Sequence, residues 1–154
     1  MEKQDWRGQI KSCFESIEIL EKCKLETVEN FKQFCEFIAE PAFEILAEEL
    51  KAYGIKAKCW ILKGKSISIR LDFPGSQADN FQYSISLPKN SVELKLRLCL
   101  RVRKTAKNSG EEWEEPFMEK VPPNKVMKIA KEELLEDVIE HYKNFTYSVL
   151  TSPE

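Results

Sequence analysis

The chain has 154 residues, of which 42% are hydrophobic and 32% are charged, and its formal net charge is −2. These values exclude a disordered or fibrous chain and predict one domain that can bury a normal hydrophobic core. The sequence contains no run of about 18 apolar residues, and its polar start, MEKQDWRGQ, lacks the apolar segment of a secretion signal. We therefore expect a cytoplasmic protein that does not enter the membrane.

Two helical patterns occupy the first 53 residues. Apolar residues at spacings of three and four, from Trp6 to Leu20, predict an amphipathic helix over about residues 4–23. A second pattern of the same period predicts a helix over about residues 28–53. Pro41 interrupts it, because proline lacks an amide hydrogen and clashes with the carbonyl group four residues earlier. We expect either a kink or a junction between two helices at this point.

The apolar period then changes from 3.6 to two, which is typical of strands that bury one face. Four such rows lie between about residues 55 and 103, and short turn-rich segments connect them. Short connections require antiparallel neighbours, because a parallel partner needs a crossover of a dozen or more residues. The sequence therefore predicts a four-stranded antiparallel meander.

The last third of the chain predicts a loop and a helix. Residues 105–123 are polar, acidic around Trp113 and interrupted by prolines, so we expect a loop that can return as a fifth strand at the sheet edge. Helical spacing of apolar residues predicts a final helix over about residues 125–147. Residues 1–154 are thus expected to form a single α+β domain, with an antiparallel sheet of four or five strands and N-terminal and C-terminal amphipathic helices packed on one face.

The five cysteines predict reduced thiols. Their number is odd, no C-x-x-C pair occurs, and each lies inside a predicted helix or strand. This usage is typical of packed thiols in a reducing compartment rather than of a disulfide framework.

Signatures of catalysis are absent from the sequence, which has no G-x-S-x-G, P-loop, Gly-rich dinucleotide turn or His/Cys cluster at metal spacing. The single histidine, His141, follows Asp137 by four residues, as in a surface ion pair. Asp72, Glu93 and Lys95 resemble the residue set of metal-dependent nucleases. A meander would however separate Asp72 from Glu93 by about 20 Å, too far to share one Mg²⁺. We expect no catalytic residue, metal site or cofactor, and rank a small hydrolase or nuclease third.

Charge is sorted along the chain. Residues 51–107 contain 13 Lys and Arg but three acids, so the sheet is basic while both flanks are acidic. In the stretch VELKLRLCLRVRK, alternate residues are apolar and most of those between them are cationic. The candidate binding residues are the outward-facing side chains of the predicted sheet together with the tryptophan of the acidic loop: Lys56, Lys58, Trp60, Arg70, Lys95, Arg97, Arg101, Arg103 and Trp113.

Several roles fit this basic face. Cations can protect edge strands from pairing, or the acidic segment around Trp113 can fold across the face. The face can also bind another protein or a second copy of the chain. Cations beside Trp60 would in addition suit nucleic acid, through phosphate contacts and base stacking. We favour a non-catalytic interaction module, an adaptor or subunit that binds a protein or itself, and keep a nucleic-acid-binding domain as the alternative.

Overall fold

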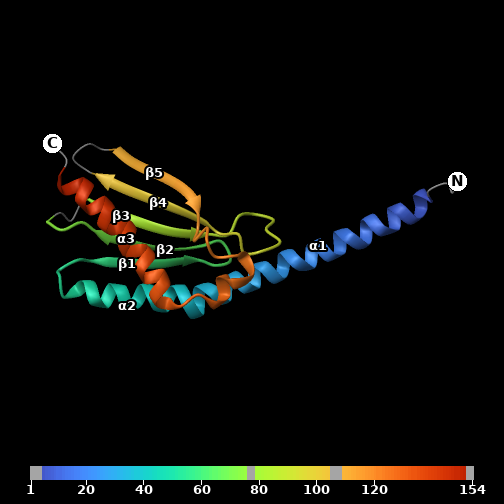
Figure 1. Cartoon of the computed structure of the whole chain (residues 1–154), viewed down its shortest axis with the longest axis horizontal. Helices are drawn as coiled ribbons and strands as arrows, with labels where there is room; N and C mark the ends of the chain where they lie inside the picture. Colours follow the sequence, from blue (N-terminus) through green and yellow to red (C-terminus); the bar gives the residue numbers. More distant parts are fainter. Residues whose placement is uncertain (1–4, 76–78, 105–108, 152–154) are drawn as a thin grey trace.

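A computed structural model describes residues 5–75, 79–104 and 109–151 of the chain (Figure 1). It confirms the predicted α+β fold class, with a five-stranded antiparallel sheet and helices at both ends. In chain order the elements are α1 (Trp6–Phe34), the π-helix η1 (Cys35–Ala39), α2 (Glu40–Lys51), β1 (Ala57–Leu62), β2 (Ser66–Asp72), β3 (Asn80–Ser86), β4 (Arg97–Lys104), β5 (Ser109–Pro116), the 3-10 helix η3 (Pro123–Lys128) and α3 (Lys131–Leu150). Within the described ranges, no helix combines the length and the apolar character that spanning a membrane requires.

The five strands form a meander in the order β1-β2-β3-β4-β5, and each pairs antiparallel with the next (Figure 1). The fifth strand comes from the acidic segment, which the sequence analysis allowed either to return at the sheet edge or to fold across the basic face. In the structure it extends the sheet beside β4, with Trp113 opposite Leu100. The described part of the acidic segment therefore does not fold across the basic face of the sheet.

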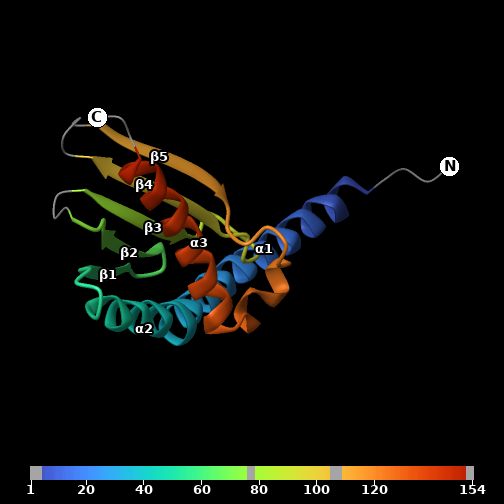
Figure 2. The ribbon, with the colours of Figure 1, turned by 60° about the vertical axis from the view of Figure 1, so that its left-hand side comes forward.

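The helices lie on one side of the sheet, and the core fills the space between the two layers (Figure 2). Apolar residues alternate along each central strand, so one face of the sheet is continuously apolar. The largest fully buried side chains are Tyr83, Phe31, Phe34, Phe43, Phe73, Phe81, Ile67, Ile69, Leu71, Ile85, Leu98 and Leu134. Within the described ranges, the opposite face of the sheet, here called the outer face, carries no helix (Figure 2).

The strand β4 begins later than the alternation in the sequence suggests. The apolar row starts at Val92, but the strand starts at Arg97, opposite Ser86 at the end of β3. Before Arg97 the chain has no partner on the β3 side, because β3 ends at Ser86. Alternation alone therefore does not produce a strand there. Val92 is exposed, whereas Leu94 is buried in the core.

The first helix differs most from the prediction. Instead of two helices separated near residue 25, α1 runs without interruption from Trp6 to Phe34 (Figure 1). Residues 21–30 contain neither glycine nor proline, so nothing ends the helix. Thr27 donates a side-chain hydrogen bond of 2.7 Å to the carbonyl of Cys23, within the helix.

Continuation of the helix carries its first part away from the sheet. Residues 6–22, here called the α1 arm, project from the body (Figures 1 and 2), and all of them except Gly8 are exposed. The predicted packing of this segment on the sheet is therefore not found. The sheet is covered by the C-terminal part of α1, by α2 and by α3.

The junction predicted at Pro41 is a π-helix followed by a new helix. The five residues of η1 precede α2, and Pro41 lies in the first turn of α2. The amide of Glu40 donates to the carbonyl of Cys35, five residues earlier, which is the wider π-helical spacing. A proline in a first turn costs little because its missing amide hydrogen would have no α-helical partner there.

Candidate interaction surface

The outer face of the sheet is built from alternate residues of the five strands. One row across its centre contains, in strand order, Trp60, Ser68, Ser84, Cys99 and Glu114. Residues directly opposite one another in neighbouring strands point to the same side, so these five side chains share the outer face. Small polar residues thus occupy its middle, with a tryptophan at one edge and a carboxylate at the other.

The adjacent row carries more charge. It contains Lys58, Arg70, Gln82, Arg101 and Glu112, again in strand order. Cations stand on three of the five strands in this row, and the acid stands on β5. The positive charge of the outer face therefore ends at β5, where carboxylates replace it.

Hydrogen bonds fix the centre of the outer face. The hydroxyl groups of Ser68 and Ser84 lie 2.7 Å apart, and the amide of Gln82 donates to the Ser84 hydroxyl at 3.1 Å. Both serines are buried although they lie on the outer face. The centre is thus a preformed polar surface.

The thiol of Cys99 is held as a hydrogen-bond donor. Its Sγ donates to Oε1 of Glu112 on β5 at 3.0 Å. Burial and this hydrogen bond to a carboxylate raise the pKa of Cys99 to about 12, although the positive charge of Arg101 acts in the opposite direction. Because only the thiolate is a strong nucleophile, Cys99 is not suited to covalent catalysis near neutral pH.

The arginines of β4 are accessible to solvent. Arg101 and Arg103 are exposed, and Arg97 is half-buried. Among the described residues, no carboxylate oxygen lies within 4.0 Å of these three guanidinium groups. Glu112 stands opposite Arg101 in the register, but its carboxylate accepts the Cys99 thiol. The charges of these three arginines therefore meet no neutralising carboxylate among the described residues.

The structure brings together most of the residues that the sequence analysis selected. Seven of the nine lie on or beside the outer face: Lys56, Lys58, Trp60, Arg70, Arg97, Arg101 and Arg103. A hollow of about 470 Å³ at the β1 edge is lined in part by Lys56, Lys58, Arg70 and Asp72. The alternation of residues along the strands thus brings these side chains to one surface.

The other two selected residues lie elsewhere. Lys95 belongs to the segment before β4 and forms an exposed ion pair with Glu93 at 3.7 Å. Trp113 stands in the β5 register opposite Leu100, on the helix side of the sheet, and its ring centroid lies 4.9 Å from that of Phe145 in α3. The role of both residues as partner contacts stays a prediction.

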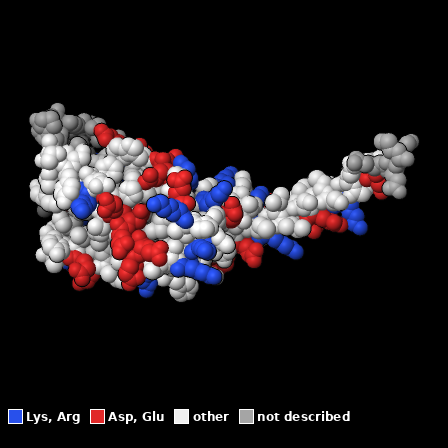
Figure 3. Space-filling model, in the orientation of Figure 1, with Lys and Arg blue, Asp and Glu red and all other residues white. Residues whose placement is uncertain are grey.

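The helix side of the molecule is acidic. Figure 3 shows this side, with a group of acidic side chains over the helix layer. Exposed acids there include Glu44 and Glu48 of α2 and Glu132, Glu133 and Glu136 of α3. Two of the helix-side acids also act on Cys59. Burial is the larger cause that raises the pKa of this thiol to about 11, and the negative charges of Glu40 and Glu44 add to it. The helix side is thus acidic, whereas the outer face combines the cations of β1, β2 and β4 with the carboxylates of β5.

A polar cluster ties α3 to the sheet. The buried hydroxyl of Tyr83 donates to Oδ2 of Asp137 at 2.5 Å, and Nε2 of His141 lies 3.7 Å from the same carboxylate and 3.5 Å from Glu115. Burial, together with the nearby Asp137 charge, raises the pKa of Tyr83 well above its ordinary value. The sequence predicted the pairing of His141 with Asp137 but not the contributions of β3 and β5. With its tyrosine fully enclosed, this cluster is suited to joining elements rather than to binding a substrate.

No metal-binding arrangement of three or more His, Cys, Asp or Glu side chains occurs within residues 5–75, 79–104 and 109–151. Asp72 ends β2, whereas Glu93 pairs with Lys95 before β4. Comparisons of the chain with protein-family models, with curated proteins and with solved structures find no match.

Proposed function

We propose that the protein is a non-catalytic interaction module, an adaptor or subunit, which binds an acidic surface of a protein partner through the outer face of its sheet. The observation that carries this proposal is the uncovered row of arginines on β4, which has no carboxylate within ion-pair distance among the described residues. The raised pKa values of Cys35, Cys59 and Cys99 further favour binding over nucleophilic chemistry.

The mixed charge of the outer face favours a protein over nucleic acid as the partner. Asp72, Glu112 and Glu114 share this face with the cations, and the two glutamates lie on β5, next to the basic strand β4. Carboxylates beside the path of a phosphate backbone would repel it, whereas alternating charges complement a protein surface of the opposite pattern. Trp60 lies on an edge strand without an aromatic neighbour on the adjacent strand, where Ser68 faces it, so a stacking platform for successive bases is not formed.

A charge reversal on β4 tests the proposal. The variant Arg97→Glu/Arg101→Glu changes the outer face, and the matched control Lys131→Glu/Lys143→Glu makes the same charge change on exposed positions of α3. Proteins captured by the wild-type chain after nuclease treatment would be purified, and their affinity for each variant measured by calorimetry. We expect the β4 variant to lose binding and the α3 variant to keep it. Equal affinity for both variants would contradict the proposal.

Oligonucleotides test the alternative. Fluorescent single-stranded and duplex probes would be titrated with the protein at salt concentrations from about 50 to about 200 mM, over which phosphate-dependent binding falls steeply. We expect weak binding at low salt. Its affinity should not fall steeply with rising salt concentration, as it would if several phosphate contacts formed. Tight, strongly salt-dependent binding that Arg97→Glu/Arg101→Glu abolishes would instead establish the face as a nucleic-acid interface.

A further inference from the structure

The α1 arm carries an apolar stripe that continues into the core of the body. Residues on this stripe alternate at spacings of four and three: Trp6, Ile10, Cys13, Ile17, Leu20, Lys24, Thr27, Phe31, Phe34 and Ile38. This average period of 3.5 keeps one side of a helix facing a single partner helix, as in a coiled coil. At the C-terminal end of the stripe, Thr27, Phe31 and Phe34 are buried in the body.

The N-terminal half of the same stripe lies open. Trp6 is 58% exposed, Ile10 is 48% exposed, Ile17 is 43% exposed and Leu20 is 48% exposed. Phe14, at 62%, borders them. On the outer part of the arm the visible charged side chains lie along one edge, and the remaining surface is uncharged (Figure 3). A contiguous apolar stripe of this length on a helix without tertiary support is typical of a surface that another element covers.

We propose that the α1 arm packs antiparallel against the α1 arm of a second copy of this chain. The charges beside the stripe select this orientation. Arg7, Phe14 and Glu21 occupy equivalent positions, seven residues apart, along one flank of the stripe. In an antiparallel pair, Arg7 lies beside the partner's Glu21 and the reverse pair forms by symmetry, while the two Phe14 side chains meet at the two-fold axis.

A parallel pair would not satisfy these charges. In that arrangement Arg7 lies level with the partner's Arg7, and Glu21 is 14 residues further along, about 21 Å away at 1.5 Å per residue. The flank of a parallel pair would therefore contain no ion pair between these two positions. Charge complementarity on this flank arises only when the two helices run in opposite directions.

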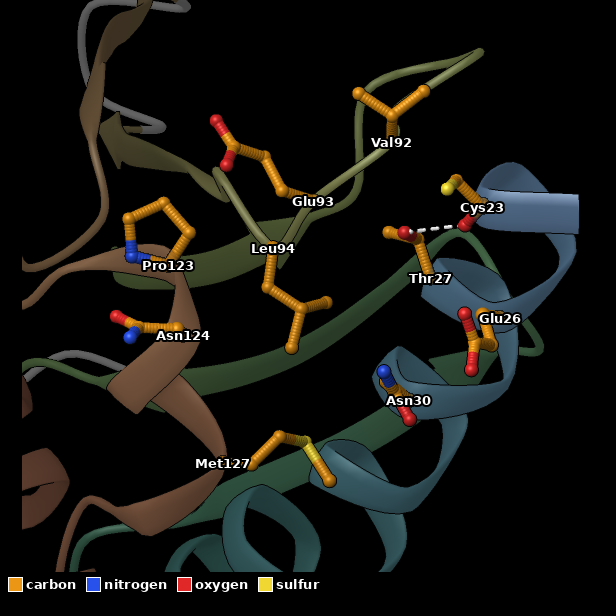
Figure 4. A pocket seen from close by; sticks show the side chains of 10 residues that line it. All are labelled: Cys23, Glu26, Thr27, Asn30, Val92, Glu93, Leu94, Pro123, Asn124 and Met127. Atoms are coloured by element: carbon orange, nitrogen blue, oxygen red, sulfur yellow. Dashed lines mark hydrogen bonds between the residues drawn. The ribbon is translucent and has the colours of Figure 1, made fainter. Parts of the chain in front are cut away.

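The same register gives the partner's Trp6 a place at the base of the arm. The partner's Trp6 would lie beside Lys24 of this chain, one turn before Thr27. A hollow of about 260 Å³ opens there between α1, the segment of residues 92–94 and η3 (Figure 4). Leu94 and Met127 extend into it in Figure 4, and the neighbouring Val92 is 45% exposed. The hollow thus offers apolar side chains, together with polar ones such as Glu26 and Asn124, to an incoming indole at the point where the register delivers one.

This inference goes beyond the proposed function, because it concerns the arm rather than the outer face. The arms project away from the body (Figures 1 and 2), so an antiparallel pair would place the two bodies at opposite ends. Dimer formation and partner binding by the sheet can therefore succeed or fail separately. The Arg97→Glu/Arg101→Glu variant should dimerise like the wild-type chain.

Sedimentation equilibrium of matched aspartate variants tests the dimer. Ile17 lies on the stripe, whereas Ile19, 62% exposed, lies two residues away and off the stripe. We expect the wild-type chain and Ile19→Asp to form dimers and Ile17→Asp to be monomeric, with the body of each variant folded by near-ultraviolet circular dichroism. A monomeric wild-type chain, or equal weakening by the two substitutions, would overturn the proposal.

Charge exchange tests the orientation. Arg7→Glu should weaken the dimer about threefold to tenfold, because it places like charges together twice in each dimer. Arg7→Glu/Glu21→Arg should restore the wild-type dissociation constant, and failure to restore it would overturn the register. Cys13 provides a second measurement. An antiparallel pair brings it near the partner's Ile17, so rapid formation of a Cys13–Cys13 disulfide on mild oxidation would establish the parallel arrangement instead.

Discussion

The packing of Trp113 against α3 leads to a quantitative prediction for Trp113→Ala. Truncation of a fully buried tryptophan to alanine costs about 3–5 kcal/mol. Trp113 is 40% exposed, so about three fifths of that loss applies, which gives about 2–3 kcal/mol. For a chain of this size, such a loss lowers the midpoint of thermal unfolding by about 5–10 °C. We expect this destabilisation because the indole anchors β5 to Phe145.

Urea unfolding followed by far-ultraviolet circular dichroism measures this loss without depending on tryptophan fluorescence. Glu114→Ala is the matched control, since Glu114 is the next residue of β5, is exposed and points to the outer face. Its free energy of unfolding should remain within about 0.5 kcal/mol of the wild-type value. A double-mutant cycle with Phe145→Ala should return a coupling free energy of about 0.5–1.5 kcal/mol between the two rings.

A small effect would refute this reasoning. If Trp113→Ala lowers the free energy of unfolding by less than about 1 kcal/mol and shows no coupling to Phe145, the indole does not hold β5 on α3. Trp113 would then be free to contact a partner, as the sequence analysis expected. A large loss of stability with unchanged partner affinity would remove it from the candidate binding residues.

Three further predictions concern buried groups. Tyr83→Phe removes the hydrogen bond to Asp137 and should lower the free energy of unfolding in urea by about 1–2 kcal/mol, because water reaches this carboxylate in part; an unchanged value would contradict the bond. Iodoacetamide should label the exposed Cys13 but not the buried Cys35 until the protein unfolds, and mass spectrometry that finds equal labelling would contradict this burial. Burial raises the pKa of Cys35 from 9.0 to about 12 and that of Cys59 to about 11. Between pH values of about 9 and 11 the unfolded chain therefore releases protons that the folded chain keeps, and the free energy of unfolding should fall with rising pH. In urea titrations the stability difference between the wild-type chain and Cys35→Ala should shrink over this range, and a constant difference would reject the assignment.

The sheet was predictable because each strand carries its own signal. Ile67, Ile69 and Leu71 alternate with polar residues and are all buried in β2. Short connections between such rows leave a meander as the simplest arrangement. The start of β4 was not predictable in the same way, because the alternation at Val92 continues beyond the end of its neighbour β3. Strand length depends on a partner strand, which a local pattern does not contain.

The path of the first helix illustrates a different limit. An apolar stripe indicates that a helix has a partner, but it does not say whether the partner belongs to the same chain. We expected Trp6 and Leu20 to pack on the sheet, and the structure leaves both exposed. Residues 21–30 held the relevant signal, because they lack a glycine or proline that would let the chain reverse. An uninterrupted helix of 29 residues is too long for all of it to lie on strands of six to eight residues.

The candidate site was predictable where it depends on alternation alone. Arg97, Arg101 and Arg103 are separated by even numbers of residues, so a strand must place them on one face. The side to which Trp113 points depends on how β5 is registered against β4, and a shift of one residue would reverse it. The composition of residues 105–108, which lie between the two strands, does not define that register. The pairing of Leu100 with Trp113 was therefore visible only in the structure.

The acidic strand β5 also limits how this sheet can grow. It forms an unpaired edge of the sheet, and the exposed residues Glu111, Glu112, Glu114 and Glu115 lie along it. If two molecules joined by aligning this edge with its own copy, eight carboxylates would face one another across a single ladder. Such repulsion guards against uncontrolled strand-by-strand aggregation without the need for a covering helix. This edge of the sheet is therefore expected to stay solvated at neutral pH rather than to pair with its own copy.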